Sequence, residues 1–249
     1  MKLTVINSGS SGNCYLLEDS KGKILMIECG VRFKEVLKAV SFSVKSIVGC
    51  IISHEHGDHA KGINEVLAAG IKVVASDGTL SKMGVSSNHN TVGLGVSINS
   101  IVLGQYQIKS FDVNHDAAQP LGFLVRHPEL GTMLFLTDTY YCEYVFPGLT
   151  SILVEANYCE NILKERVDSG SSPKFLRDRV IQSHLSLKNC KELLSANDLS
   201  KVNDIVLIHL SDKNSHAARF QQEVQELTGK KTHIAVPGLV IENFGLDPF

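Results

Sequence analysis

The chain is built from short apolar runs separated by turn residues, a pattern that predicts β-strands. The run 47–52 is apolar at nearly every position and stops abruptly at Ser53 and His54. Such a run fits a strand buried on both faces, and its polar end fits a functional loop that follows the strand. We predict strands at residues 3–6, 14–17, 24–27, 47–52, 71–75, 100–103, 106–113, 122–126, 133–137, 151–155, 204–208 and 234–244.

Between these runs, apolar residues spaced three and four positions apart predict helices. Phe33, Val36 and Val40 fall on one helical face in this way. Ser215 is the expected N-cap of the last helix, and Gly229 is its expected stop. We predict helices at residues 32–40, 60–69, 161–168, 187–196 and 215–229, and a polar, glycine-rich loop region around one short helix at 77–97.

The order of these elements favours two sheets packed face to face with helices outside them, rather than one parallel sheet. Strands occur in clusters, whereas helices are distributed through both halves of the chain. No segment has the composition of an interdomain linker, and 249 residues fit one α/β domain. We therefore expect a single domain over residues 1–249.

Composition narrows the class of protein. The chain is 43% hydrophobic and 20% charged, which is enough apolar material for a full core. Its formal charge of −2 excludes a global basic field, although a local basic rim is sufficient to hold phosphates. The six cysteines form no C-x-x-C pair, and neither a signal peptide nor a membrane-spanning stretch is visible. We expect a cytoplasmic protein with reduced thiols and no membrane association.

The segment SHEHGDHA, residues 53–60, carries the most specific chemistry. It places His54, His56, Asp58 and His59 directly after a predicted buried strand. Imidazole and carboxylate groups are the ligands that suit zinc, manganese or iron. In a tight loop, two of the histidines can converge on one ion while the aspartate and the last histidine turn toward a second. The alternative, a polar loop with coincidental histidines, is a poor explanation for four such residues within six positions.

With this motif the sequence resembles the metallo-β-lactamase superfamily over nearly the whole chain. The resemblance implies an α/β (α+β) fold, the four-layer αββα sandwich, as one domain without a β-CASP insertion. It also implies two divalent metal ions, zinc or manganese with iron as a third candidate, at one edge of the sandwich. His115 and Asp138 match family ligands, with Asp138 as the bridging carboxylate, and His209 matches the last histidine of the second metal.

Further segments resemble the YycJ/WalJ-like branch, which is grouped with nucleases and phosphodiesterases. These segments are SGSSGNCYLLE, LVEANYCE, SHLSLKNC and IHLSDKNS. The repeated H-L-S also resembles tRNA-processing zinc phosphodiesterases, which implies that His184 assists catalysis; the alternative is a polar residue at a helix N-terminus. Glu28 stands where the family usually has an aspartate that supports the metal loop.

These features predict a dinuclear phosphodiesterase or nuclease that acts on DNA, RNA or a small phosphodiester. A hydroxide shared by the two ions is the expected nucleophile. Asp58 and His184 are the expected catalytic residues. A thioester or lactam hydrolase, glyoxalase-like or lactamase-like, is the alternative enzyme, and a non-catalytic binding module is the third option. Because every expected ligand position is filled, the sequence argues against a degenerate member. It carries no sign of the oligomeric state.

Substrate contacts are expected from polar loops near the metal motif. The turn SGSSGN offers backbone N–H groups for an anion, or is simply a tight connection between two strands. The basic residues of 174–179 form either a phosphate rail or a solvated helix face. The candidate substrate-binding residues are Ser10, Ser11, Asn157 and Ser211.

Overall fold

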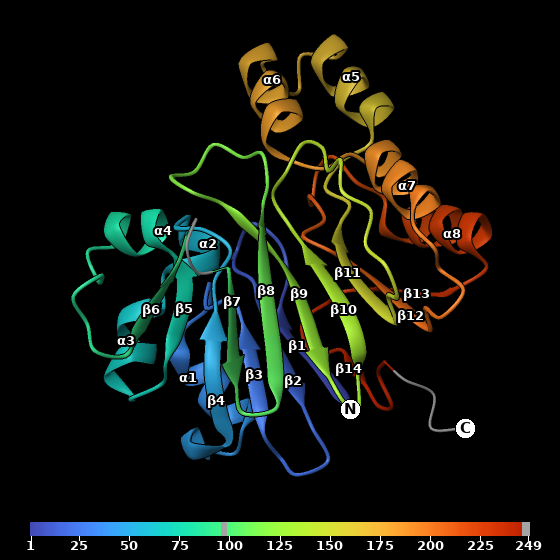
Figure 1. The fold of residues 1–249 in the computed structure, drawn as a ribbon. Coiled ribbons are helices and arrows are strands. Elements are labelled where there is room, and N and C mark those ends of the chain that lie inside the picture. The colour runs from blue at the N-terminus through green and yellow to red at the C-terminus, as the bar shows by residue number, and fades with distance from the viewer. Residues whose placement is uncertain (96–98, 246–249) are drawn as a thin grey trace.

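Two seven-stranded sheets pack face to face in the computed structural model, which describes residues 1–95 and 99–245 (Figure 1). The first sheet has the order β14-β1-β2-β3-β4-β5-β6 and the second the order β13-β12-β11-β10-β9-β8-β7. The strands of the first sheet are β1 (Lys2–Asn7), β2 (Cys14–Glu18), β3 (Ile24–Ile27), β4 (Ile47–Ile51), β5 (Val73–Ser76), β6 (Thr91–Leu94) and β14 (Val240–Ile241). Those of the second are β7 (Ser100–Leu103), β8 (Tyr106–Asp112), β9 (Leu121–His127), β10 (Gly131–Leu136), β11 (Ser151–Glu155), β12 (Asp204–Ile208) and β13 (Lys231–Ile234).

Both sheets combine an antiparallel part with a parallel part. Strands β1 to β3 are antiparallel, whereas β3 to β6 are parallel. In the second sheet β7 to β10 are antiparallel, and β10 to β13 are parallel. The carboxyl ends of β10, β11 and β12 therefore meet at one edge of the second sheet, where loops commonly carry functional residues.

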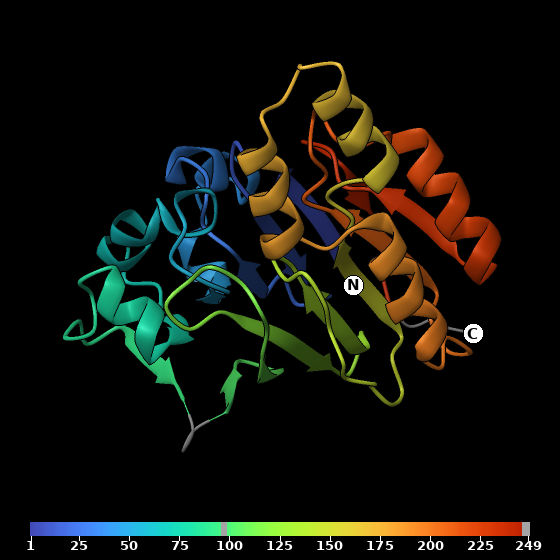
Figure 2. The same cartoon turned by 90° about the horizontal axis from the view of Figure 1, so that it is seen from above.

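Three apolar layers hold the sandwich together. The first lies between the sheets and includes the fully buried Tyr15, Phe123 and Phe135. The other two lie between each sheet and its helices, which Figure 2 shows on opposite sides of the strands. The helices are α1 (Phe33–Ala39), α2 (Gly57–Ala60), α3 (Ile63–Ala68), α4 (Asp77–Lys82), α5 (Glu160–Asp168), α6 (Lys174–Ser183), α7 (Leu187–Ala196) and α8 (Ala217–Thr228). This architecture confirms the predicted αββα sandwich.

Helices α5 and α6 stand above the sandwich in Figure 1, apart from the helices that cover the sheet faces. Of the ten residues of α6, only Ser183 is buried. None of the helices within 1–95 and 99–245 is long and apolar enough to cross a membrane.

Several predicted boundaries are wrong, each for a local reason. The predicted helix 60–69 is divided into α2 and α3, because the chain bends at Gly62, where a side chain would lie 2.7 Å from the Cys29 carbonyl oxygen. His216, not Ser215, is the N-cap of α8, since its ring accepts a hydrogen bond from the Arg219 N–H; Gly229 ends the helix with a φ of 64°, as predicted.

Two strands and one helix also differ from the prediction. The predicted strand 234–244 contains only the last residue of β13 and the two residues of β14, which lie in different sheets on either side of a turn at Gly238. The predicted loop region 77–97 contains α4 but also β6, which pairs with β5; its residues 96 and 97 lie outside the described part of the chain. Helix α6 was not predicted, because its apolar side chains form no stripe that faces a core.

Candidate metal centre

The SHEHGDHA loop follows β4 and is hydrogen-bonded to the side chain of Glu28. This carboxylate is fully buried, and its Oε1 accepts a hydrogen bond from the Ser53 N–H at 3.1 Å. The Ser53 hydroxyl in turn lies 2.9 Å from Nδ1 of His54. Glu28 therefore supports the loop, which is the role expected of the family's aspartate.

Four of the predicted ligands, His54, His56, His115 and Asp138, form a first group of donor atoms at one edge of the sandwich. Nε2 of His54 lies 3.4 Å from Oδ2 of Asp138, and Nε2 of His115 lies 3.5 Å from the same oxygen. Nδ1 of His56 is 3.1 Å from Nε2 of His115. The His54 nitrogen is buried and has no hydrogen-bond partner among the described residues. A buried, unpartnered imidazole nitrogen aimed at other donors is what a metal ligand requires.

A second group, formed by Asp58, His59 and His209, lies beside the first, and its His59 approaches Asp138. Nε2 of His59 lies 3.4 Å from Oδ2 of Asp58 and 3.2 Å from Oδ2 of Asp138. Nε2 of His209 lies 3.2 Å from the same Asp58 oxygen. On the far side of its ring, Nδ1 of His59 faces Oε2 of Glu28 at 3.6 Å. The donor atoms of the first group lie within 4.8 Å of one another, and so do those of Asp58, His59 and His209. Asp138 forms a further cluster of this size with Glu155, His184 and His209.

The spacing and charge of these groups fit divalent ions. Ligands about 2.1 Å from a tetrahedral zinc ion are about 3.4 Å apart, close to the separations found here. Burial alone would raise the pKa of the Asp138 carboxyl, but His209 and His59 hold that pKa well below its ordinary value. Burial and the neighbouring His59 lower the pKa of His54, which leaves its nitrogen lone pair free. Anionic carboxylates and neutral imidazoles are the protonation states that bind metal. Burial lowers the pKa of His59 and of His209, but the Asp138 carboxylate and its acidic neighbours outweigh burial and raise it well above its ordinary value. Binding of an ion by His59 and His209 therefore releases protons.

Two of these residues are placed by an unusual backbone conformation. Asp138 has a φ of 46° and His209 a φ of 52°, and Glu28, which supports the loop, has a φ of 63°. Non-glycine residues rarely adopt the left-handed region, and those that do cluster at functional sites. Here the conformation turns each side chain toward the donor groups directly after a buried strand.

Outside the donor groups, hydrogen bonds orient two of the histidines. Nδ1 of His115 donates to the Ser183 carbonyl at the end of α6 at 2.7 Å, so its Nε2 carries the free lone pair. Nδ1 of His209 donates to Oε1 of Glu155 at 2.9 Å and lies 2.7 Å from Oδ1 of Asp138. Such partners fix the tautomer and the ring orientation of a ligand.

Glu155 is a functional residue that the sequence analysis missed. It is fully buried at the end of β11, and Oε1 accepts hydrogen bonds from Nδ1 of both His184, at 2.8 Å, and His209. Its other oxygen accepts the Leu185 N–H at 3.0 Å. The available signal was a single carboxylate at the end of the otherwise uncharged run SILVE.

The donor groups open into a pocket of about 450 Å³, here called the central pocket. His184 lines this pocket; it is the C-cap of α6 and lies two residues before Ser186, the N-cap of α7. Of the candidate substrate contacts, Ser10, Asn157 and Ser211 line the pocket and Ser11 does not. Arg179 is the member of the basic stretch that lines it.

The turn SGSSGN packs against the metal loop. The backbone N–H of Asn13 donates to the Asp58 carbonyl at 2.7 Å, and its side-chain amide lies 3.2 Å from Nε2 of His59. The N–H groups of Gly9 and Gly12 are bonded within the turn. This arrangement favours the structural reading of the turn, as a support for Asp58 and His59.

Substituting Gly30 by alanine is expected to destabilise the protein by about 3 kcal/mol and to reduce its metal content. A side chain at Gly30 would overlap the carbonyl oxygen of Asp58, which is backbone and has no room to move. Gly57→Ala is the matched control in the same loop, since a side chain there meets nothing within 4 Å. Thermal unfolding and metal analysis check this, and equal melting temperatures for the two variants would contradict it.

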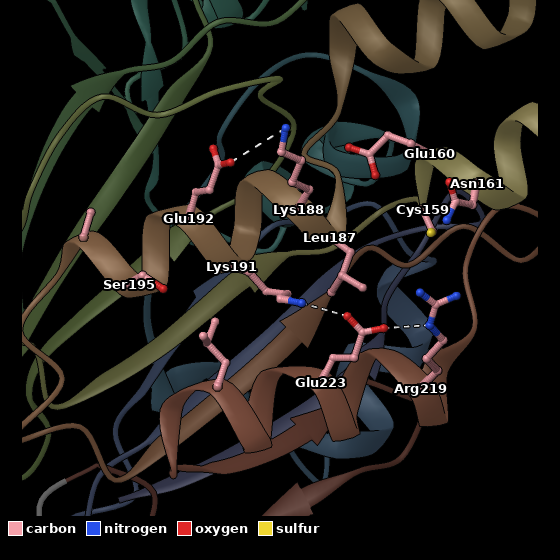
Figure 3. Close-up of a pocket in the computed structure, with 12 residues that line it drawn as sticks. Cys159, Glu160, Asn161, Leu187, Lys188, Lys191, Glu192, Ser195, Arg219 and Glu223 are labelled. Atoms are coloured by element: carbon pink, nitrogen blue, oxygen red, sulfur yellow. Dashed lines mark hydrogen bonds and ion pairs between the residues drawn. The ribbon is translucent and has the colours of Figure 1, made fainter.

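A larger hollow lies elsewhere, between α7 and α8, with a volume of about 680 Å³ (Figure 3). Most of its charged side chains pair with one another: Glu223 with Lys191 at 2.8 Å and with Arg219 at 2.7 Å, and Lys188 with Glu192 at 3.9 Å. It has no histidine in its lining. The central pocket is therefore the candidate active site, although it is smaller.

Comparison with known proteins agrees with this centre. The family model of the anti-Pycsar protein Apyc1 matches residues 5–77, the part that contains the SGSSGN turn and the SHEHGDHA loop. Over 234 residues the chain is 30% identical to the exodeoxyribonuclease WalJ of Streptococcus pneumoniae serotype 2, covering 86% of this chain and 83% of that relative. Over 248 residues it is 25% identical to the exodeoxyribonuclease YycJ of Bacillus anthracis, covering 93% and 90%.

Among solved structures, the metallo-β-lactamase fold protein YhfI from Bacillus subtilis superposes with a TM-score of 0.73 at 16% identity. The superposition covers 96% of this chain and 98% of that one. Fold, histidine and aspartate clusters, and sequence similarity over most of the length agree with one another. The chain belongs to the metallo-β-lactamase-fold hydrolases related to the WalJ and YycJ exodeoxyribonucleases.

Proposed function

We propose that this protein is a dinuclear metal-dependent exodeoxyribonuclease. The observation that carries the proposal is the pair of donor groups with Asp138 between them at the floor of an open pocket. Two metal sites that share a carboxylate are the arrangement used for in-line attack on phosphodiesters. The named activity of the relatives WalJ and YycJ supports DNA as the polymer and cleavage from an end.

The donor set fits zinc or manganese, with iron as a third candidate. His54, His56 and His115 would hold the first ion, and Asp58, His59 and His209 the second, with Asp138 between them. When bound, the two ions supply Lewis-acid chemistry, which makes water nucleophilic at neutral pH and offsets charge on the phosphate.

His184 supplies the proton for the leaving oxygen in this proposal. Its Nδ1 donates to Glu155, so its Nε2 is directed away from that carboxylate, on a ring that lines the central pocket. Burial lowers the pKa of His184, but the carboxylates of Glu155 and Asp138 outweigh burial and raise it to about 10. The imidazolium form is therefore present at neutral pH, ready to protonate the sugar oxygen that leaves.

The remaining polar groups of the pocket orient the phosphate. Ser10 and Ser211 carry hydroxyls there that are suited to donate to phosphate oxygens. The Asn157 amide donates to the His209 carbonyl at 2.8 Å and thereby holds the loop after β12. We assign Asn157 a positioning role, and the two serines direct contact with substrate.

Incubation of metal-loaded protein with end-labelled DNA, RNA and bis(p-nitrophenyl) phosphate tests the proposal. Stepwise shortening of DNA that is lost in Asp58→Ala is the expected result, because Asp58 belongs to the second donor group. Preference for RNA would contradict the choice of polymer. Hydrolysis of a thioester or lactam, with every phosphodiester left intact, would replace the proposal by the other hydrolase class.

Removing metal is expected to lower the melting temperature, and adding zinc or manganese back is expected to restore it. The donor groups join loops that follow four different strands, so an ion bound there stabilises the native state only. At an ion concentration one hundred times the Kd, the gain in unfolding free energy is about 2.7 kcal/mol. Scanning calorimetry with and without a chelator measures it. A His54→Ala variant that responds to metal as strongly as the unaltered protein would contradict the assignment.

A further inference from the structure

A second groove of about 600 Å³ adjoins the central pocket, and we call it the side groove. The two hollows share His115, Asp116 and Arg179, so they are continuous at the first donor group. The side groove is lined by Tyr140, two residues beyond Asp138, and by Phe175 in the first turn of α6. Nothing in the proposed chemistry of the central pocket uses this groove.

The helix that lines the side groove exposes apolar side chains beside the active site. Phe175 is 68% exposed, and Leu176 and Ile181 are each 42% exposed. Tyr140 and Tyr141, in the loop after Asp138, are also more than two-fifths exposed. Exposed apolar side chains gathered beside a catalytic pocket indicate a surface that is covered when the ligand binds.

The charges around the side groove argue against an anion as its occupant. Arg179 faces Asp116, with its Nε 3.5 Å from an aspartate oxygen, and Arg177 pairs with Asp178 at 2.6 Å. These guanidinium groups are already neutralised by carboxylates, so the groove attracts phosphate weakly. Its aromatic walls and the amide of Gln182 suit a planar, uncharged group with hydrogen-bonding edges.

A nucleobase has this chemistry, and the position of the groove relates the base to the reacting phosphate. His115 belongs both to the first donor group and to the lining of the side groove. A group in the groove therefore lies next to a phosphate at the donor groups. A base that lies in the groove against Tyr140 and Phe175 presents its hydrogen-bonding edge to the Gln182 amide, so that edge is not paired with a complementary base.

We propose that the side groove binds an unpaired nucleobase of the DNA strand being cut, next to the reacting phosphate, against Tyr140 and Phe175. The substrate is then a single-stranded end, or a duplex end that has frayed. This inference rests on the proposed exodeoxyribonuclease function and adds to it the strand state of the substrate and two residues that recognise it.

Steady-state kinetics on single-stranded oligonucleotides tests the inference. Tyr140→Ala and Phe175→Ala are each expected to raise KM by roughly 5- to 100-fold with little change in kcat, because an aromatic contact to a base contributes binding and no chemistry. Tyr140→Phe and Phe175→Tyr keep a ring and are expected to restore KM. Phe42→Ala is the matched control, since Phe42 is 67% exposed and lines neither hollow.

An abasic residue next to the cleaved bond provides the decisive comparison. On that oligonucleotide the unaltered protein is expected to show the raised KM of the alanine variants, and the variants are expected to lose nothing further. Alanine variants with an unaltered KM on the complete oligonucleotide, or an abasic residue without effect, would overturn the inference while DNA hydrolysis still supports the proposed function. If the unaltered protein hydrolyses no DNA at all, the proposed function itself fails, and the inference falls with it.

Discussion

Replacing Asp138 by asparagine is expected to slow DNA hydrolysis by at least about 10³-fold and to reduce the number of ions bound per chain. Oδ2 of Asp138 lies within 3.5 Å of donor nitrogens from both groups, from His54 and His115 on one side and His59 on the other. The substitution keeps the size of the side chain and removes its negative charge. It therefore weakens both ion sites at once.

Metal analysis and single-turnover kinetics measure the effect of Asp138→Asn. Asp168→Asn on the exposed side of α5 is the control, because it removes an equal charge away from the donor groups. A protein with asparagine at 138 that binds two ions and cuts DNA at the unaltered rate would refute the shared-carboxylate assignment.

The second large effect is expected at His184, where alanine should lower kcat on DNA by about 10²- to 10³-fold and leave the metal content intact. His184 lies beside the donor groups, and its Nδ1 is 3.7 Å from Oδ1 of Asp138. Protonation matters when the leaving oxygen is a poor leaving group, as a sugar hydroxyl is. The loss should therefore be much smaller on bis(p-nitrophenyl) phosphate, whose leaving group departs as a stable anion.

The pH profile gives a second readout of the same role. Because the pKa of His184 is raised, its acidic form is present at neutral pH and is lost as the pH rises through that value. DNA hydrolysis by the unaltered protein is expected to fall on the alkaline side, and His184→Ala should lack this decline. Equal losses on both substrates, together with an unchanged profile, would assign His184 to positioning.

Much of the fold was predictable because the buried strands consist of continuous apolar runs that are visible in the sequence. Strands such as β11 and β12 are buried at every position, and β3 likewise, so their apolar runs marked them. Strand β6 was not predictable in this way, since only its last residue is buried and its pairing with β5 decides its conformation. Helix α6 was not predictable either, because only Ser183 of its ten residues is buried and it therefore has no apolar face in its sequence.

The candidate site was predictable where its residues are adjacent in the chain. Four donors fall within SHEHGDHA, and the later ones follow strands that the sequence had marked. Glu155 was missed because its role depends on hydrogen bonds to His184 and His209, which lie in other segments of the chain. No local sequence pattern indicates that these three residues are close together. The same holds for Tyr140, which lies in a loop, and Phe175, which lies in α6, because the two residues line one groove only in the folded chain.

Residues 238–244, near the C-terminal end of the chain, pair with β1 and cover its edge, and this affects the order in which the first sheet forms. The Val5 N–H donates to the Leu239 carbonyl at 2.9 Å, and the Phe244 N–H donates to the Met1 carbonyl at 2.8 Å. During synthesis β1 emerges before β14, which follows only after the strands of the second sheet have been made. Until then one edge of β1 is open, and open strand edges pair readily with other chains. Newly made chains are thus most prone to aggregation before these residues leave the ribosome, and least prone once they have closed the sheet.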